Sequence, residues 1–256
     1  MKLLLDIGNS RIKWAYSGGG ELRHAGASEH RGQPAAAAAR LLDELPVQPS
    51  AAVAVNVAGA AFAREITALL QQRWGIELAL VAAAAACKRL RNGYTEPAQL
   101  GADRWAAIAG AWAAAVPAAA DRVIVDAGTA LTVDILRADG QHLGGLIVPG
   151  LALMRTALGQ ATSDLGRYAG PAAQSPAAPA NGVGTSTRSA IEEGGLNALC
   201  GLIERVLKAH AQRSAAACLL LTGGDADRLH RRLAVAAEVR PLLVLEGLDY
   251  LTTDPD

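Results

Sequence analysis

The sequence has no excess of either charge. Its 24 lysine and arginine residues are balanced by 24 aspartate and glutamate residues, so the formal net charge is zero. Surfaces that bind nucleic acid or anionic membranes usually carry a basic excess, and the balance argues against both partners. We therefore expect no nucleic acid and no membrane among the partners of this chain.

Potential metal ligands of the zinc type are few and scattered. The three cysteines, Cys87, Cys200 and Cys218, are odd in number and show no metal-ligand spacing. The five histidines include no pair at the spacing that brings two ligands onto one helix face. These absences predict a reduced, cytosolic protein without a zinc site.

Long apolar runs are missing as well. The alanine-rich stretches "PAAAAAR" and "VAAAAAC" are too short to span a bilayer. The first apolar run, "MKLLLDIG", reaches Asp6 too early for a secretory signal peptide. We expect a soluble cytoplasmic protein.

What the chain does have is an alternation of strand-like and helix-like segments. Apolar runs bounded by turn residues predict strands at 2–5, 12–16, 52–57, 77–81, 122–126, 131–136, 143–148, 217–222 and 241–245. Helical patterns lie at 34–45, 62–73, 103–115, 150–158, 187–209 and 225–235. This alternation predicts an α/β protein with mixed sheets. The stretch 161–186, dense in Ala, Pro, Gly and Ser, predicts a long disordered or functional loop.

A repeat within the sequence predicts two domains. "LLLDIGNSRIKWAY" at 3–16 resembles "VIVDAGTALTVDIL" at 123–136, because each has an apolar strand, Asp-x-Gly, and a second apolar strand. Self-similarity of this kind indicates two domains built on one plan, although two unrelated hairpins could match equally well. We place the boundary near residue 117, which gives domains 1–117 and 118–256.

The Asp-x-Gly turns suit phosphate binding. Glycine brings its own N–H close to a ligand, and successive turn amides form an anion-binding concavity. Asn9 and Ser10 can add donors, and Arg11 or Lys13 can add positive charge. A carboxylate at position 6 fits beside phosphate if a hydrated Mg²⁺ lies between them. The simpler alternative is a hairpin turn in which polar side chains bond only their neighbours.

The second hairpin offers Asp126, Gly128 and Thr129 for the same task. Two such loops could hold the phosphates of a nucleotide between two domains. Neither of the two familiar phosphate motifs is present: there is no G-x-x-x-x-G-K-[ST], and no G-x-G-x-x-G follows the first strand.

Asp103 has two interpretations. It falls at the start of an alanine-rich helix in "LGADRW", where a helix N-cap is the ordinary role of aspartate. The alternative is a general base beside Arg104, whose guanidinium suits a carboxylate or phosphate. Two glycine-rich segments, "GGLIVPG" at 144–150 and "TGGDAD" at 222–227, are further candidate ligand contacts at strand-to-helix connections. Each is equally compatible with a plain connection, in which Asp225 is an N-cap.

Five segments, taken in order, resemble the type III pantothenate kinases. They are "DIGNSR", "NGYTEPAQLGADRW", "DAGTALTVD", "GGLIVPG" and "TGGDAD". The resemblance spans nearly the whole chain. It implies a duplicated ribonuclease-H-like (actin-like ATPase) fold, and ATP-dependent phosphorylation of pantothenate in the first step of coenzyme A synthesis. It also implies Mg²⁺, a monovalent cation (K⁺ or NH₄⁺), and a homodimer in which the partner chain helps close the pantothenate site.

The resemblance assigns roles by position. Asp103 is the proton acceptor, and Asp126 holds the monovalent cation. The ATP-binding residues are Asp6, Ile7, Gly8, Asn9, Ser10, Arg11, Ile12, Lys13 and Thr129, with Asp6 also facing Mg²⁺ through water. The pantothenate-binding residues are Tyr94, Gly101, Ala102, Asp103, Arg104 and Thr187.

Two departures from the family pattern stand out. Ser10 replaces a frequent threonine and keeps the hydroxyl. "GTST" replaces the usual Asn-Thr or Asp-Thr, which leaves Thr185, Ser186 and Thr187 as alternatives for one substrate contact. Two other functions stay open from the residues alone: a kinase for another small hydroxyl substrate, and a nucleotide-binding accessory protein of the same fold.

Overall fold

The computed structural model describes residues 1–30, 32–83, 87, 89–117, 119–162, 164–168, 182–213 and 217–253. It divides into two compact units. The first comprises residues 1–115, 139–144 and 242–256, and the second comprises residues 116–138 and 145–241.

The first unit is built on a five-stranded mixed sheet. Its strands are β1 (Lys2–Ile7), β2 (Arg11–Gly18), β3 (Glu21–Glu29), β4 (Ala51–Asn56) and β5 (Leu78–Leu80). They lie in the order β3-β2-β1-β4-β5. The β1–β2 and β2–β3 pairs are antiparallel, and β4 runs parallel to both β1 and β5.

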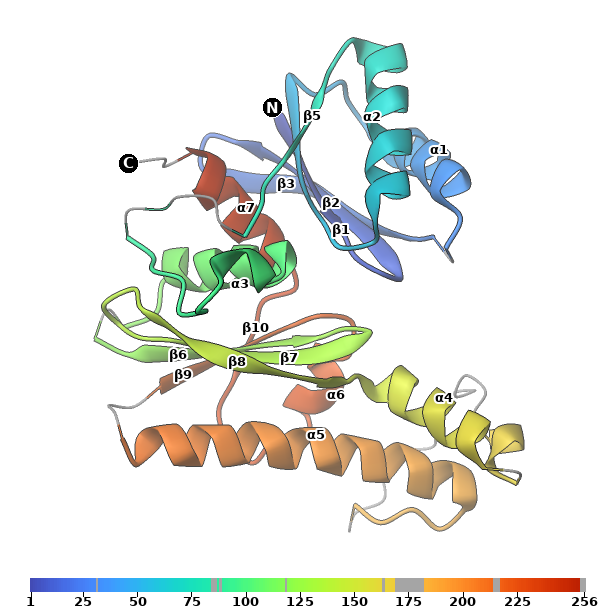
Figure 1. The fold of residues 1–256 in the computed structure, drawn as a ribbon, viewed down its shortest axis with the longest axis vertical. Coiled ribbons are helices and arrows are strands. Elements are labelled where there is room, and N and C mark those ends of the chain that lie inside the picture. The colour runs from blue at the N-terminus through green and yellow to red at the C-terminus, as the bar shows by residue number, and fades with distance from the viewer. Residues whose placement is uncertain are drawn as a thin grey trace. The chain divides into compact units, whose positions relative to one another are not determined.

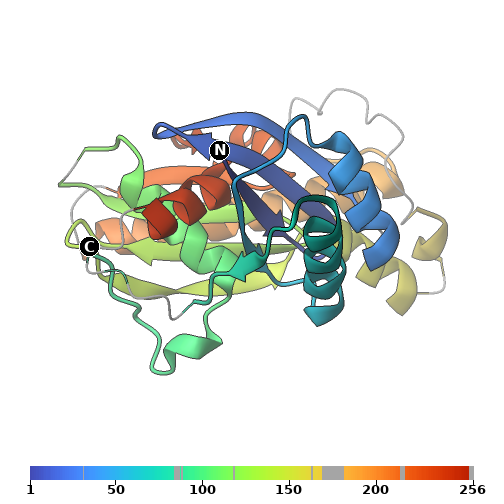
Figure 2. The ribbon, with the colours of Figure 1, turned by 90° about the horizontal axis from the view of Figure 1, so that it is seen from above.

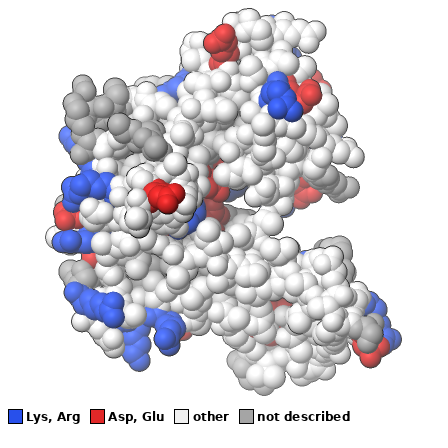
Figure 3. Space-filling view, viewed as in Figure 1, with Lys and Arg blue, Asp and Glu red and all other residues white. Residues whose placement is uncertain are grey.

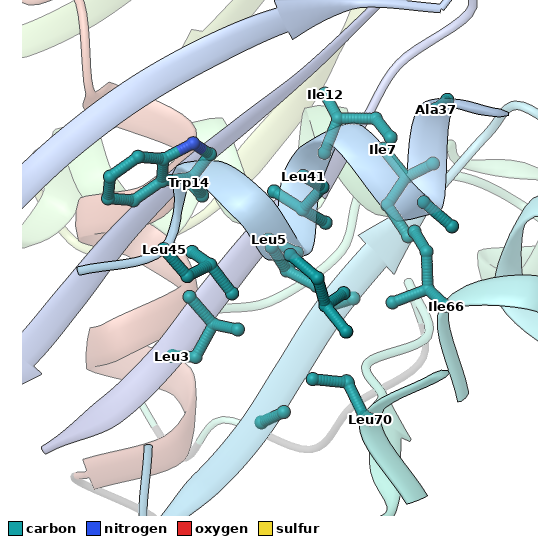
Figure 4. Close-up of a cluster of buried hydrophobic side chains, with 14 of the residues drawn as sticks. Leu3, Leu5, Ile7, Ile12, Trp14, Ala37, Leu41, Leu45, Ile66 and Leu70 are labelled. Carbon is teal, nitrogen blue, oxygen red and sulfur yellow. The ribbon is translucent and has the colours of Figure 1, made fainter. Parts of the chain in front are cut away.

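Helices cover both faces of this sheet. They are α1 (Pro34–Glu44), α2 (Ala60–Trp74), α3 (Ala102–Ala113) and α7 (Leu243–Thr253), with a short 3₁₀ turn η1 (Pro97–Gln99). Helices α1 and α2 lie side by side in both views (Figures 1 and 2). They bury Leu41, Ile66 and Leu70 against Leu3 and Leu5 of β1 (Figure 4).

The alternation of side chains along β1 sorts its residues between the two faces. Leu3, Leu5 and Ile7 belong to the core under α1 and α2. Because successive side chains of a strand point to opposite faces, Leu4 and Asp6 lie on the other face. Helix α7 packs against β1, and α3 packs against β4. Asp6 therefore lies on the sheet face that α3 and α7 cover.

Two glycines let α3 and α7 approach closely. A Cβ on Gly110 would overlap the carbonyl oxygen of Leu243, and a Cβ on Gly247 would overlap that of Ala106. Small residues at a helix crossing allow the backbones to come together. The alanine-rich face of α3 is therefore a packing surface that fixes where its N-terminus lies.

The second unit has its own five-stranded sheet. Its strands are β6 (Asp121–Ala127), β7 (Ala130–Leu136), β8 (His142–Pro149), β9 (Ala217–Thr222) and β10 (Glu238–Val239). The order is β10-β9-β6-β7-β8, with β6 antiparallel to β7 and parallel to β9. The helices are α4 (Leu151–Ala161), η2 (Leu165–Tyr168), α5 (Thr187–Ala211) and α6 (Ala226–His230).

The core of the second unit follows the pattern of the first. Val123, Val125 and Ala127 of β6 pack against side chains of α5 and α6 such as Leu199 and Leu229. Figure 1 shows α5, in orange, running along its sheet. By the same alternation, Asp126 points to the opposite face, as Asp6 does in the first unit.

The two sheets have the same topology. In each, a central strand pairs with an antiparallel hairpin partner on one side and a parallel strand on the other. The predicted duplicated α/β fold with mixed sheets is confirmed. The similarity between residues 3–16 and 123–136 reflects two hairpins at equivalent places in the two sheets.

Several predicted elements differ from the structure. The predicted strand 241–245 is wrong: β10 is confined to Glu238–Val239, and α7 begins at Leu243. Strand β3 was not predicted, and the helix predicted at 225–235 is limited to α6. Of the predicted loop 161–186, residues 165–168 form η2, and residues 163 and 169–181 lie outside the described residues.

The compact units also differ from the predicted division at 117. The change of unit lies between residues 115 and 116, and the C-terminal segment 242–256 belongs with the first unit. Within the described ranges, no helix combines the length and apolar character needed to cross a membrane.

Candidate active site

The first predicted phosphate loop is the turn between β1 and β2. The strands pair Asp6 with Lys13 and Ile7 with Ile12, and the Gly8 N–H donates to the Arg11 carbonyl at 3.0 Å. Asp6 is 9% exposed, whereas Asn9 and Ser10 are exposed at the tip. The carboxylate is thus held at the base of the turn and the polar donors stand at its mouth.

The two cations of this hairpin have different surroundings. Arg11 forms an exposed ion pair with Glu29 of β3, with 3.0 Å between Nη2 and Oε1. Lys13 is half-buried and lies directly opposite Asp6 in the antiparallel register, where side chains share a face. Lys13 is therefore the cation that the strand geometry places on the same sheet face as Asp6.

The second predicted loop has the same construction. Asp126 pairs with Thr132, and the Gly128 N–H donates to the Ala130 carbonyl at 3.1 Å. A Cβ on Gly128 would lie 3.6 Å from the Asp126 Oδ1, an ordinary van der Waals contact. A Cβ on Gly223, which has φ of 94°, would lie only 2.5 Å from the same oxygen.

Both glycine-rich segments of the second unit pack on this loop. The Gly150 N–H donates to the Thr129 carbonyl at 2.9 Å, and Gly150 precedes the first residue of α4. The Asp225 N–H donates to the Ala127 carbonyl at 3.0 Å. The N-terminus of α4, where partial positive charge favours anions, therefore lies beside the exposed Thr129.

An ion-pair network supports the segment that follows β9. Glu192 of α5 is buried and pairs with Arg228 and with Arg155, the latter at 3.3 Å. Arg228 also pairs with Asp225 at 3.2 Å. Burial lowers the pKa of Arg228, but the pairs with Glu192 and Asp225 outweigh this and raise it. Asp225 is at the N-cap position of α6, yet its carboxylate bonds Arg228 and makes no cap hydrogen bond.

Tyr94 and Arg104 come together in the first unit. Arg104 is only 5% exposed, and its Nη1 donates to the Tyr94 hydroxyl at 2.7 Å. The guanidinium also lies 5.4 Å from the centre of the Tyr94 ring, within cation–π range. The two residues are ten positions apart, and their contact joins the loop before η1 to the first turn of α3.

His142 is a member of this cluster that the sequence did not reveal. It is fully buried at the start of β8, and its ring stacks on Tyr94 with centroids 5.8 Å apart and planes 19° apart. The Gly93 backbone lies against it, since a Cβ on Gly93 would overlap the His142 carbonyl. His142 thus contacts the ring whose hydroxyl holds Arg104.

Asp103 is not the N-cap of α3. The N-cap is Gly101, and Asp103 is the second residue of the helix. Its Oδ1 accepts the Arg104 backbone N–H at 2.8 Å, and a Cβ on Gly101 would lie 2.5 Å from the same oxygen. Asp103 therefore lies in the first turn of α3, beside the partial positive charge of the helix N-terminus. Ala102, the first helical residue, is half-buried beside it.

The three candidate hydroxyls at the start of α5 differ in their contacts. Ser186 is the N-cap, and it forms a reciprocal capping box with Ser189. Thr185 and Thr187 are exposed on either side of it. The cap occupies the Ser186 hydroxyl and favours the threonines as ligand contacts.

The donor set fits a hydrated divalent cation rather than a protein cage. Among the described residues, no group of three or more His, Cys, Asp or Glu side chains could enclose a metal ion. Mg²⁺ characteristically keeps several waters and binds through one or two carboxylates and the phosphates of a substrate. The single carboxylate of Asp6 beside an exposed polar turn fits that mode.

The chain has the actin-like ATPase fold, built from two ribonuclease-H-like halves. It is similar to the activator of the 2-hydroxyisocaproyl-CoA dehydratase from Clostridium difficile with bound ADPNP, with a TM-score of 0.53, 13% identity, and 99% and 94% of the two chains covered. It is also similar to the ethanolamine utilization protein EutJ from Carboxydothermus hydrogenoformans, with a TM-score of 0.52, 14% identity, and 98% and 89% covered.

The particular family follows from sequence. Residues 2–209 match the model of the type III pantothenate kinases. Type III pantothenate kinase of Halorhodospira halophila is 39% identical over 260 residues, covering 97% of this chain and 96% of that protein. That of Burkholderia mallei is 42% identical over 265 residues, covering 97% of each. The chain belongs to the type III pantothenate kinase family.

Proposed function

We infer that the protein transfers the γ-phosphoryl group of ATP to pantothenate and produces 4′-phosphopantothenate, the first step of coenzyme A biosynthesis. Family membership supports the reaction. The observation that carries the assignment to residues is the contact of Arg104 with Tyr94 directly beside Asp103. It provides a cation for the pantothenate carboxylate and a base for its hydroxyl on adjacent positions of one helix.

The roles follow from the chemistry of each side chain. Asp103 accepts the proton of the primary hydroxyl, and Arg104 binds the carboxylate. Tyr94 fixes the guanidinium of Arg104 through their hydrogen bond. The helix start at Gly101 and Ala102 brings the backbone close to the substrate, and Thr187 adds a hydroxyl contact.

The hairpin at residues 6–13 and Thr129 hold ATP. Phosphoryl transfer passes through a loose transition state, so its catalysis rests on positioning and on neutralising charge. The backbone amides of the Gly8 and Gly128 turns and the side chain of Lys13 serve those purposes.

Two cations complete the charge balance. Asp6 faces Mg²⁺ through water, and Mg²⁺ supplies neutralisation of the phosphates. Asp126 binds the monovalent cation, K⁺ or NH₄⁺. Gly223 leaves room beside this carboxylate, because a Cβ there would lie only 2.5 Å from the Asp126 Oδ1.

We propose a cytoplasmic homodimer that uses the β8–α4 surface. β8 is an edge strand, and Leu146, Ile147, Leu153 and Leu158 are exposed on β8 and α4, Ile147 to 62%. Figure 3 shows that the surface over β8 and the start of α4 is largely without charged residues on this side. Exposed apolar patches of this kind mark association surfaces. Ile147→Asp would convert a dimer in analytical ultracentrifugation to a monomer, and an unchanged sedimentation coefficient would refute this surface.

The test of the reaction is ADP release by the purified protein with and without pantothenate, in potassium and in sodium buffer. We expect release that depends strictly on pantothenate and is faster in potassium. A panel of sugars and short acyl acids tests the other-kinase alternative. ADP release independent of pantothenate, or faster with another acceptor, would overturn the proposed function.

A further inference from the structure

We propose that His30 is a positioning residue for ATP, which acts by fixing the peptide between Gly8 and Asn9. The proposal rests on the proposed role of residues 6–13 as a phosphate loop. His30 follows β3 and is only 1% exposed. Its imidazole Nε2 lies 2.7 Å from the Gly8 carbonyl oxygen.

The two hydrogen-bond partners of the His30 ring determine which ring nitrogen carries the proton. The Gly32 N–H donates to His30 Nδ1 at 3.1 Å, and a backbone N–H can only donate. The Gly8 carbonyl can only accept, so Nε2 carries the hydrogen. Both bonds exist together only in the neutral imidazole with the proton on Nε2.

The bond to Gly8 orients the next amide. A trans peptide is planar, and its C=O and N–H point in opposite directions. Because the Gly8 carbonyl is held toward His30, the Asn9 N–H is directed away from it, at the exposed tip of the turn. That direction is the one an amide needs to donate to a phosphate oxygen outside the turn.

The backbone of His30 fixes a second peptide of the same turn. Its N–H donates to the Ser10 carbonyl at 3.2 Å. His30 therefore holds the carbonyls of Gly8 and Ser10, the two neighbours of Asn9. It holds the first through its side chain and the second through its main chain. A side-chain substitution removes only the first of these bonds.

The ring is itself held in place by α2. The His30 ring packs on the Phe62 ring with centroids 4.3 Å apart and planes inclined by 54°. Phe62 is buried in the core of the first unit. The imidazole is thus anchored on the rigid part of the fold, as a group that positions a loop must be.

Three variants separate positioning from plain packing. His30→Leu fills the same space with an apolar side chain and leaves the Gly8 carbonyl without its donor. His30→Gln keeps an N–H donor at similar reach. Leu70→Ala, also in α2, is the control that loosens the same core at a residue away from the His30 ring. Each is measured for Kd of ATP by calorimetry without pantothenate, for KM of both substrates, and for melting temperature.

We expect His30→Leu to raise Kd and KM for ATP about three- to tenfold, the size of one neutral hydrogen bond, with KM for pantothenate unchanged. His30→Gln should recover most of the affinity. Leu70→Ala should lower the melting temperature, because it leaves a cavity in the core, with ATP affinity unchanged. Equal ATP affinity in His30→Leu and the wild type, or equal losses of ATP affinity in His30→Leu and Leu70→Ala, would overturn the proposal.

A measurement on the unaltered protein tests the proposal independently of activity. The ¹⁵N spectrum of the His30 ring should show a protonated Nε2 and an unprotonated Nδ1 at pH 7.5. A proton on Nδ1 would overturn it. Absence of pantothenate-dependent turnover in the wild type would refute the proposed function, whereas the ATP affinities and the ring spectrum judge His30 separately.

Discussion

The Arg104 guanidinium lies over the Tyr94 ring and donates to the Tyr94 hydroxyl at 2.7 Å. Because Arg104 is only 5% exposed, its charge depends on this oxygen for part of its solvation. The pair fixes the direction of a cation at the start of α3, one residue after the proposed base.

Tyr94→Phe tests this relationship. The variant keeps the ring and removes the oxygen, so the guanidinium loses a charge-assisted hydrogen bond worth about 1.5–3 kcal/mol. We expect KM for pantothenate to rise about tenfold or more, with Kd for ATP unchanged. Steady-state kinetics with each substrate varied check this. An equal rise in KM for both substrates would instead indicate a general disturbance of the fold.

His142 should matter through the same ring. His142→Leu removes the stacked face of Tyr94, and aromatic pairs contribute about 0.5–1.5 kcal/mol beyond their buried area. We expect KM for pantothenate to rise severalfold in His142→Leu and less in His142→Phe, which retains a ring. Equal effects of the two substitutions would refute a role for stacking.

The close crossing of α3 and α7 should tolerate no added methyl group. A Cβ on Gly247 would overlap the Ala106 carbonyl, which is backbone and cannot move aside cheaply. Gly247→Ala should therefore destabilise the protein by about 1–3 kcal/mol, as overpacked sites do. Gly201→Ala is the matched control. It lies in α5 with nothing within 4 Å, and alanine there should stabilise by about 0.5–1 kcal/mol. Urea unfolding curves measure both.

The Cys200 thiol should make the free energy of unfolding fall as the pH rises above 9. Burial, with a smaller contribution from Glu204, raises the pKa of its thiol to about 11. The unfolded thiol ionises near its ordinary value of 9.0, so between pH 9 and 11 the folded state binds more protons than the unfolded state. The associated stability is present below pH 9 and lost as pH rises toward 11, by up to about 3 kcal/mol.

The Cys200→Ala variant isolates this contribution. Its free energy of unfolding, measured from pH 8 to 11, should fall less steeply than that of the wild type. In the wild type, the buried Cys200 thiol should also react with a thiol reagent at pH 8 only after unfolding. Parallel pH profiles for the two proteins would contradict a raised pKa at this position.

Much of this architecture could be predicted from the sequence, because the central strands are continuous apolar runs. Residues 3–5 and 123–125 are buried on both faces and read as strands without ambiguity. The edge strand β3, "ELRHAGASE", lacks that pattern because most of its side chains are exposed, so its pairing with β2 was hidden.

The error at residues 241–245 has a different cause. "PLLVLEG" is a short apolar run, which periodicity alone cannot assign to strand or helix. The structure resolves it as the start of α7, since Leu243, Val244 and Leu248 are buried and Gly247 meets the backbone of α3. That contact joins segments more than a hundred residues apart, and no local signal encodes it.

The site shows the same division. The turns at Gly8 and Gly128 could be predicted, because Asp-x-Gly between apolar strands is a local pattern with a local reason. The places of His30 and His142 could not be predicted, since each contacts a partner that is distant along the chain, Gly8 in one case and Tyr94 in the other. Asp103 could be predicted at the start of a helix, but only the backbone shows that it is the second residue of α3 and not the N-cap.

The most direct test of the central claim is pantothenate-dependent ADP release by Asp103→Asn, with Kd for ATP measured alongside. The amide cannot take the hydroxyl proton but keeps the shape of the carboxylate. General-base assistance is typically worth about 10²–10⁴-fold, so turnover should fall by that factor while Kd for ATP stays as in the wild type. Near-normal turnover in this variant would contradict the account.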